Sequence, residues 1–269
     1  MPACAETCAP AGAAACAETG APAGATACAE TGAPAGATDC AETGAPAGAT
    51  ACAETDAPAS SEAGRIAASC GLCGLFSETC QRLSGRRLCH VKGVAATAYA
   101  YALKYGADVC KAVAAALYHD WFRDAGTDRL DALIEAYGLD ARLKGNPDLS
   151  HSKIAAAYME NELGIDDSEL LDAVRFHTTG RPAMSLLEKV IYIADATEPS
   201  RVFPAVSRLR ELAWEDLDKA CVFALENTIR YVEERGGRLD TDTLEALGWL
   251  NAAAGATCKK ERGFDVAEQ

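Results

Sequence analysis

Four histidines and two aspartates carry the residue types and positions that suit a metal site. The chain has only four histidines, and each lies in or at the end of a different predicted helix that also bears apolar residues: His90, His119, His151 and His177. A single histidine in such a place is usually a hydrogen-bonded core residue. Four of them, with none elsewhere in the chain, favour a shared site.

The two aspartates stand in or beside apolar segments. Asp120 is the residue after His119, and this pair comes shortly after the apolar run 112–117. On its own this pair is a weak signal, because it is more often a helix cap or a solvated turn. Asp195 lies within the apolar segment 190–196, where an ionised carboxylate is costly unless it is paired, hydrogen-bonded or bound to a metal. Beside the four histidines, we favour metal ligation for both aspartates.

The combined donor set exceeds the needs of one tetrahedral zinc ion and suits two metal ions that share a bridging carboxylate. Its members are His90, His119, Asp120, His151, His177 and Asp195. Imidazole and carboxylate ligands without thiolate are typical of iron or manganese, and fit zinc less well. The sequence therefore predicts a centre of two metal ions.

Cations and hydroxyl groups follow the predicted ligands closely along the chain. Arg123 comes shortly after Asp120, and Arg201 shortly after Asp195, so both are candidates for binding phosphate. The turn that follows His177 offers the hydroxyl groups of Thr178 and Thr179 to an oxyanion and contains the further cation Arg181. The alternative is that these are ordinary surface arginines and a helix end.

Helices must position these side chains. Periodicity of the 3.6-residue type predicts helices over 77–84, 86–105, 107–120, 128–137, 151–163, 167–177, 184–197, 205–236 and 241–253. Gly106, Gly164 and Gly180 are placed to end three of them, and Asp166 or Asp167 to begin another. No alternating pattern of five or more residues predicts a strand. We therefore predict an all-α fold in a single helical domain.

The N-terminal part has a different composition. A 12-residue unit repeats from Cys4 to about Ala63, and its Cys-Ala-Glu-Thr start recurs at positions 4, 16, 28, 40 and 52. The units contain no large apolar side chain, so they cannot build a core, and a solenoid is disfavoured for the same reason. We predict a disordered repeat tail over residues 1–63, a folded domain over 64–255 and a flexible C-terminal tail over 256–269.

Charge and composition limit the partners and the compartment. The net charge of −14 argues against a nucleic-acid or anionic-membrane partner. No run approaches the roughly 18 to 20 apolar residues that span a bilayer, and the N-terminus lacks the pattern of a secretory signal. The 13 cysteines lie in the repeat or are scattered, with one unpaired Cys-x-x-Cys motif at 70–73, which favours reduced thiols. We expect a cytoplasmic protein.

Two longer runs are more specific than the His-Asp pair. They are His-Thr-Thr-Gly-Arg-Pro-x-Met-Ser at 177–185 and Ala-Asp-x-x-Glu-Pro-x-Arg at 194–201. With the order His, His-Asp, His, His, Asp along a helical chain, these runs resemble the HD-domain metal-dependent phosphohydrolases. The similarity is strongest to the bacterial YqeK-type symmetrical bis(5'-nucleosyl)-tetraphosphatases, and it covers roughly residues 75 to 252.

The resemblance implies an HD-domain helical bundle with two divalent or mixed-valence metal ions, iron first and manganese as the alternative. The implied reaction is hydrolysis of diadenosine tetraphosphate to two ADP by a hydroxide that the metals hold. All six donors become ligands, and Asp120 bridges the ions at the catalytic centre. The implied partner is a dinucleoside polyphosphate, and a homodimer is compatible with this interpretation.

The resemblance also implies substrate contacts. Phosphate groups are expected at Arg201 and at the loop formed by Asp148, Leu149 and Ser150, and the segment with Thr241 and Thr243 is expected to line the nucleotide pocket. The family usually has a lysine where this chain has Arg123. The guanidinium keeps the positive charge at this catalytic position but does not release a proton at ordinary pH.

Three alternatives remain beside this interpretation. The chain could be another HD-domain nucleotide phosphohydrolase, such as a nucleotidase or an alarmone hydrolase. It could also be a nucleotide-binding HD module without turnover, although the intact ligand set argues against that. The third alternative places the function in the repeat, as a thiol-rich tether for a metal or a partner.

Overall fold

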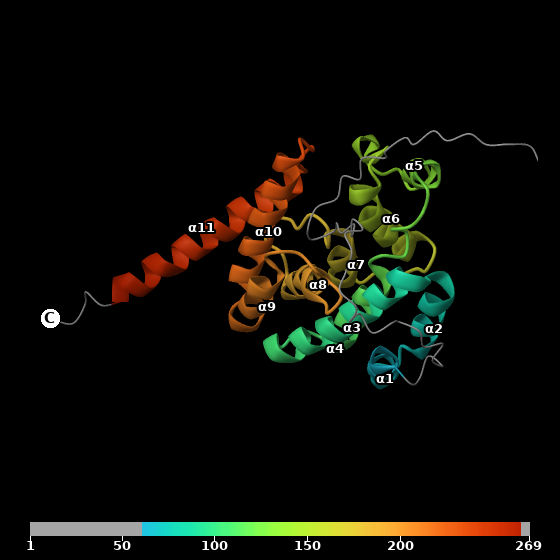
Figure 1. Ribbon diagram of the computed structural model, residues 1–269, viewed down its shortest axis with the longest axis horizontal. Coiled ribbons are helices and arrows are strands. Elements are labelled where there is room, and N and C mark those ends of the chain that lie inside the picture. The colour runs from blue at the N-terminus through green and yellow to red at the C-terminus, as the bar shows by residue number, and fades with distance from the viewer. Residues whose placement is uncertain (1–60, 265–269) are drawn as a thin grey trace, which may run out of the picture. The chain divides into compact units, whose positions relative to one another are not determined.

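The computed structural model describes residues 61–264 of the chain. Within this range the protein consists of eleven α-helices and one short 3₁₀ helix and contains no strand, which confirms the predicted all-α fold (Figure 1). No helix in the described range combines the length and the apolar character needed to cross a membrane.

The helices follow one another through short connections. Their order is α1 (Glu62–Ser69), α2 (Cys73–Arg82), α3 (Gly85–Tyr105), α4 (Val109–Tyr118), α5 (Thr127–Ala136), η1 (Ala141–Leu143), α6 (Pro147–Asn161), α7 (Ser168–Arg175), α8 (Leu186–Thr197), α9 (Val206–Glu215), α10 (Leu217–Glu234) and α11 (Thr241–Phe264).

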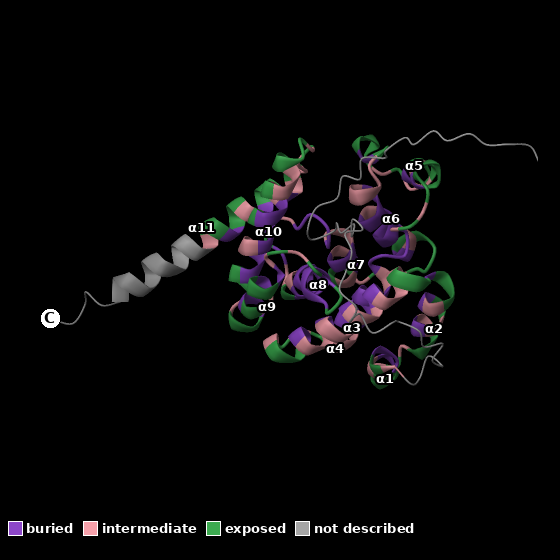
Figure 2. Cartoon of the chain, in the orientation of Figure 1, coloured by how far each residue is buried: buried purple, intermediate pink, exposed green. Residues whose placement is uncertain are grey.

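Helix α8 is the centre of the bundle. It packs against α3, α4, α7, α9 and α10, and every residue from Val190 to Thr197 is buried (Figure 2). A helix that is apolar on all sides is stable only inside the protein, which explains why this segment lies at the core. Asp195 is carried near the end of this buried helix.

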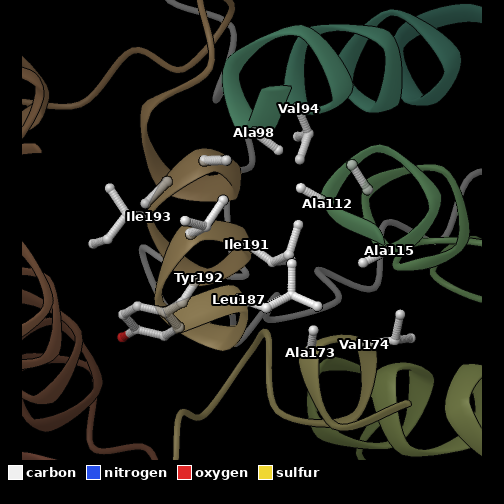
Figure 3. Packing of buried hydrophobic residues seen from close by; sticks show 14 of the residues in the cluster. Val94, Ala98, Ala112, Ala115, Ala173, Val174, Leu187, Ile191, Tyr192 and Ile193 are labelled. Atoms are coloured by element: carbon white, nitrogen blue, oxygen red, sulfur yellow. The ribbon is translucent and has the colours of Figure 1, made fainter. Parts of the chain in front are cut away.

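Small side chains let the neighbouring helices approach α8 closely. Figure 3 shows Leu187 and Ile191 of α8 facing Ala112 and Ala115 of α4, while Tyr192 points to the opposite side. All five side chains are almost completely buried. The backbones of α4 and α8 can therefore lie near each other, which brings the end of α4 close to Asp195.

A tight turn folds α4 back along α3. Gly106 ends α3 with φ of 78°, and its amide donates to the carbonyl of Ala102. Asp108 then begins α4, because its carboxylate accepts hydrogen bonds from the amides of Cys110 and Lys111. This turn brings His90 of α3 and His119 at the end of α4 to the same part of the bundle.

The predicted helix over 205–236 is wrong in one respect, because the structure divides it into α9 and α10. Asp216 has extended backbone angles, φ −155° and ψ 114°, and its carboxylate accepts from the amides of Asp218 and Lys219. This local capping competes with helix continuation, and the apolar periodicity on either side of Asp216 does not reveal it.

Other helix boundaries also differ from the sequence prediction. Helix α6 begins at Pro147 rather than at 151, with Asn146 as its cap, and proline is favoured at the first helical position.

The predicted pattern also lacks α1 and η1. Helix α1 is capped by Ser61, so residues 61–63 belong to it and not to the repeat, while the disorder predicted for the preceding residues lies outside the described range. Helix α11 continues past residue 255 to Phe264, and the division into domains remains a prediction.

The turn between α3 and α4 provides a test of the fold. Gly106→Ala places a β-carbon at a left-handed backbone position, which costs about 1–2 kcal/mol. No other atom lies within 4 Å of that β-carbon, so the loss measures backbone strain alone. Gly248→Ala is the matched control, because Gly248 lies inside α11 with equally open surroundings, and alanine there should stabilise by about 1 kcal/mol. Urea unfolding of both variants measures the two opposite shifts, and equal shifts would contradict the assigned turn.

Candidate metal centre

The structure brings all six predicted metal ligands together in the interior. They come from α3, from the ends of α4 and α7, and from α6 and α8, and each has an exposed fraction of 5% or less: His90, His119, Asp120, His151, His177 and Asp195. Residues separated by more than one hundred positions in the sequence therefore contribute to one buried cluster.

The carboxylate of Asp120 lies between two pairs of imidazoles. Its Oδ2 is 3.5 Å from Nε2 of His90 and 3.4 Å from Nε2 of His119. Its Oδ1 is 3.3 Å from Nε2 of His151 and 3.8 Å from Nε2 of His177. One carboxylate thus presents a different oxygen to each pair, which is the arrangement of a bridging ligand.

Asp195 completes the side of the cluster that contains His90. Its Oδ1 lies 3.0 Å from Nε2 of His90 and 3.9 Å from Nε2 of His119. Ligand atoms that surround one ion at about 2.1 Å are roughly 3.0 to 3.4 Å apart. The spacing of these donor atoms therefore fits the coordination of metal ions.

Three of the histidines are oriented by hydrogen bonds to the backbone. In each of them Nδ1 donates to a carbonyl three or four residues earlier, at 2.7 to 2.9 Å: Ala116 for His119, Pro147 for His151 and Val174 for His177. A proton on Nδ1 leaves the lone pair of Nε2 available, and Nε2 is the atom that points into the cluster. These bonds select the tautomer that metal binding requires.

The electrostatic surroundings favour the metal-binding protonation states at several of the ligands, whereas at His90 burial opposes protonation but the contacts with Asp195 and Glu198 raise the pKa. Burial, together with the neighbouring His119 and His151, lowers the pKa of His177 to about 3. Burial also lowers the pKa of His151. For Asp120, burial opposes ionisation, but the adjoining imidazoles of His119 and His151 and the charge of Arg87 hold its pKa well below the usual range. Neutral imidazoles and ionised carboxylates are the forms that coordinate metals.

Two guanidinium groups contact the carboxylates of the cluster. Arg201, predicted as a phosphate ligand, donates from Nη2 to the carboxylate of Asp195 and from Nε to its backbone carbonyl at 2.7 Å. Arg87 donates from Nη1 to Oδ2 of Asp120 at 2.5 Å. The sequence interpretation missed Arg87, although its position one helical turn before His90 on α3 was a usable signal.

Comparison with known proteins identifies the family. The sequence pattern of the HD domain matches residues 87–200. The symmetrical bis(5'-nucleosyl)-tetraphosphatase of Bacillus subtilis is 39% identical over 171 residues, which are 63% of this chain and 92% of that protein. The protein of the same name from Halalkalibacterium halodurans is 41% identical over 169 residues, 62% of this chain and 90% of its own length. This chain belongs to the HD-domain phosphohydrolase family.

A solved structure supports the same assignment. The crystal structure of a predicted HD superfamily hydrolase involved in NAD metabolism from Clostridium acetobutylicum aligns with a TM-score of 0.64 and 38% sequence identity. The alignment covers 67% of this chain and 96% of the other. The His and Asp cluster therefore belongs to an HD domain whose donors suit divalent metal ions.

A cavity lies beside the cluster of histidines and aspartates. Four residues predicted to contact substrate line it: Asp148, Leu149, Thr178 and Thr243. Oγ1 of Thr178 also lies 3.5 Å from Nε2 of His151, so the cavity adjoins the cluster. The sequence interpretation missed the other lining residues, which α10 and its connection to α11 contribute: Thr228, Val232, Arg238, Leu239 and Asp240.

Several predicted substrate residues lie outside this cavity lining. The hydroxyl of Thr179 donates to the carbonyl of Gly180, and that of Thr241 accepts from Arg142 at 3.3 Å. Ser150 is buried near the cavity, and its hydroxyl has no hydrogen-bond partner among the residues that the structure describes. Substrate contact by these residues remains a prediction.

The two remaining cations of the predicted site differ in their surroundings. Nη2 of Arg123 lies 2.5 Å from Oδ1 of Asp148, so this cation is held beside the cavity. Arg181 instead donates to both carboxylate oxygens of the buried Glu188, at 2.5 and 2.9 Å, and fixes the turn before α8. Arg123 therefore keeps a position suited to substrate contact, while Arg181 has a role in the fold.

The cluster predicts that metal binding and stability are linked. Because the donors converge only in the folded chain, added Mn²⁺ should raise the melting temperature in a concentration-dependent way. Asp195→Ala should reduce the bound metal and abolish most of that rise, whereas Asp128→Ala, a change at an exposed position on α5, should leave it unchanged. Elemental analysis and thermal unfolding measure both effects, and full metal content in Asp195→Ala would remove Asp195 from the site.

Proposed function

We propose that this chain hydrolyses diadenosine tetraphosphate symmetrically and releases two molecules of ADP. The observation that carries the proposal is the complete buried His and Asp cluster, within a domain 39% and 41% identical to two proteins of that activity. The match spans 92% and 90% of those proteins, so it covers nearly their whole length.

The proposed cofactors are two divalent or mixed-valence metal ions, with iron first and manganese as the alternative. Asp120 would contribute one oxygen to each ion. His90, His119 and Asp195 would complete one site, and His151 and His177 the other. When bound, such ions supply positive charge to a phosphoryl group and activate water for attack on phosphorus.

We assign one nucleoside end of the substrate to the cavity beside the cluster. Its lining combines apolar side chains, such as Leu149 and Leu239, with polar groups, such as Thr178 and Asp240. That mixture suits a base and a ribose. With one nucleoside held there, the separation between the cavity and the cluster decides which phosphorus is attacked. Two phosphates on the cavity side of the cleaved bond give ADP from each half.

Arg123 is proposed to bind the tetraphosphate as a fixed positive charge. Its partner Asp148 lines the cavity, and Arg123 itself follows Asp120 by one turn, so the guanidinium lies between the two parts of the site. A phosphate oxygen would take the place of the Asp148 carboxylate as the acceptor. Because arginine stays protonated, this residue contributes charge and orientation and does not transfer a proton.

The product pattern tests the proposed function. Purified protein loaded with iron or manganese should convert diadenosine tetraphosphate to ADP as the sole nucleotide product, as separated by chromatography. ATP together with AMP would show asymmetric cleavage and contradict the proposal. Absence of turnover at full metal occupancy would also contradict it and would favour another nucleotide phosphohydrolase or a binding module.

Substitution of Arg123 tests its assigned role. Arg123→Met should lower kcat/KM for the tetraphosphate by roughly 10²–10³-fold, which is typical for loss of one hydrogen-bond donor that stabilises transition-state charge. Arg123→Lys, which keeps the charge, should recover most of that loss. Steady-state kinetics measure both variants, with Arg129→Lys at an exposed position on α5 as the control. Wild-type kinetics in Arg123→Met would exclude a role in substrate binding or turnover.

A further inference from the structure

His90 differs from the other three histidines in what holds its outer nitrogen. The other rings donate from Nδ1 to backbone carbonyls, but Nδ1 of His90 lies 3.1 Å from Oε1 of Glu198. Glu198 comes directly after α8 and has an exposed fraction of only 1%. A buried carboxylate on the distal nitrogen of a metal-binding imidazole fixes the ring and raises its basicity.

One short segment of the chain contacts both nitrogens of this ring. Asp195 approaches Nε2 of His90 at 3.0 Å, and Glu198, three residues later, approaches Nδ1. The imidazole is therefore held between two carboxylates from the end of α8. A shift of this segment would move both contacts together.

Glu198 is itself fixed by its neighbours. The amide of Ser200 donates to Oε2 at 2.7 Å, and the hydroxyl of Ser200 donates to Oε1 at 2.5 Å. Nε of Arg201 lies 3.9 Å from Oε1, which adds a positive charge close to the buried group. These contacts orient the carboxylate towards His90 and offset part of the cost of burying it.

Gly93 provides the space that this carboxylate occupies. A β-carbon at position 93 would lie 2.6 Å from Oε2 of Glu198, which is too short for a contact between a methyl carbon and an oxygen. Gly93 lies one turn after His90 on α3, so both residues face the same carboxylate. The space taken by Glu198 accounts for a glycine inside a long helix, where glycine is otherwise unfavourable.

We propose that Glu198 is a positioning residue that fixes His90 for metal binding, and that Gly93 is glycine because the Glu198 carboxylate needs its volume. This inference rests on the proposed metal-dependent function and adds residues outside the ligand set. Because Glu198 contacts only His90 among the four histidines, its effect is confined to the ion bound on the side of His90, His119 and Asp195.

A metal titration of the full chain tests the inference without any substrate. Metal-free protein is titrated with Mn²⁺, and the free ion is followed by electron paramagnetic resonance. Wild type should bind two ions. Glu198→Gln keeps the size and an acceptor oxygen but loses the charge, so one of the two dissociation constants should rise by about 10–100-fold while the other stays unchanged.

Two further variants separate positioning from a general effect on folding. Gly93→Ala should weaken the binding of the same ion. Combining it with Glu198→Gln should raise that dissociation constant little further, because both changes act on one contact. Glu188→Gln is the matched control. Glu188 is equally buried in α8 but bonds Arg181 and Ser185, so its loss should lower the melting temperature and leave both Mn²⁺ affinities unchanged.

The outcomes distinguish this inference from the proposed function. Wild-type affinities in Glu198→Gln, or equal losses in Glu198→Gln and Glu188→Gln, would overturn the positioning role. Wild-type protein that binds no Mn²⁺ would overturn it together with the metal-dependent function. If wild-type protein binds two ions but does not cleave diadenosine tetraphosphate, the result would contradict only the proposed substrate. The positioning role of Glu198 would be unaffected.

Discussion

The ionised carboxylate of Asp120, buried between four imidazoles, is the interaction on which the rest of the site depends. Removing a charge from water costs several kcal/mol unless other groups compensate it. Arg87 offsets part of that cost. The Nε2 lone pairs of the imidazoles face both oxygens of Asp120, so a bound cation would offset the remainder. A helix arrangement that separated the two pairs of histidines would remove the place where such a cation fits.

The helical framework meets this requirement with few irregular elements. The Gly106 turn returns α4 along α3, and alanines allow α4 to approach the buried α8. Asp120 therefore comes within reach of histidines carried by α3 and α6. The cavity lies beside this framework, but the later helices contribute much of its lining. The predicted ligands and most of the cavity lining are therefore carried by different parts of the chain.

The sequence was sufficient to predict the helical class and all the donors that meet in the cluster. Four isolated histidines and an aspartate in an apolar helix are local signals, because burying such groups needs an explanation wherever they occur. Arg87 and Glu198 were not predicted as part of the site, because their roles arise from contacts between helices that only the packing determines. The division at Asp216 was missed for a related reason, since a single cap outweighed the apolar periodicity.

The ligands of the cluster are distributed along the chain from His90 to Asp195, and this has a consequence for how the protein matures. The α3–α4 hairpin carries His90, His119 and Asp120, but His151, His177 and Asp195 come from later helices, so a partly folded chain lacks the complete donor set. Contacts between such distant segments form late in folding, as the bundle closes. Metal bound by the complete set would therefore stabilise the closed bundle against its partly folded forms.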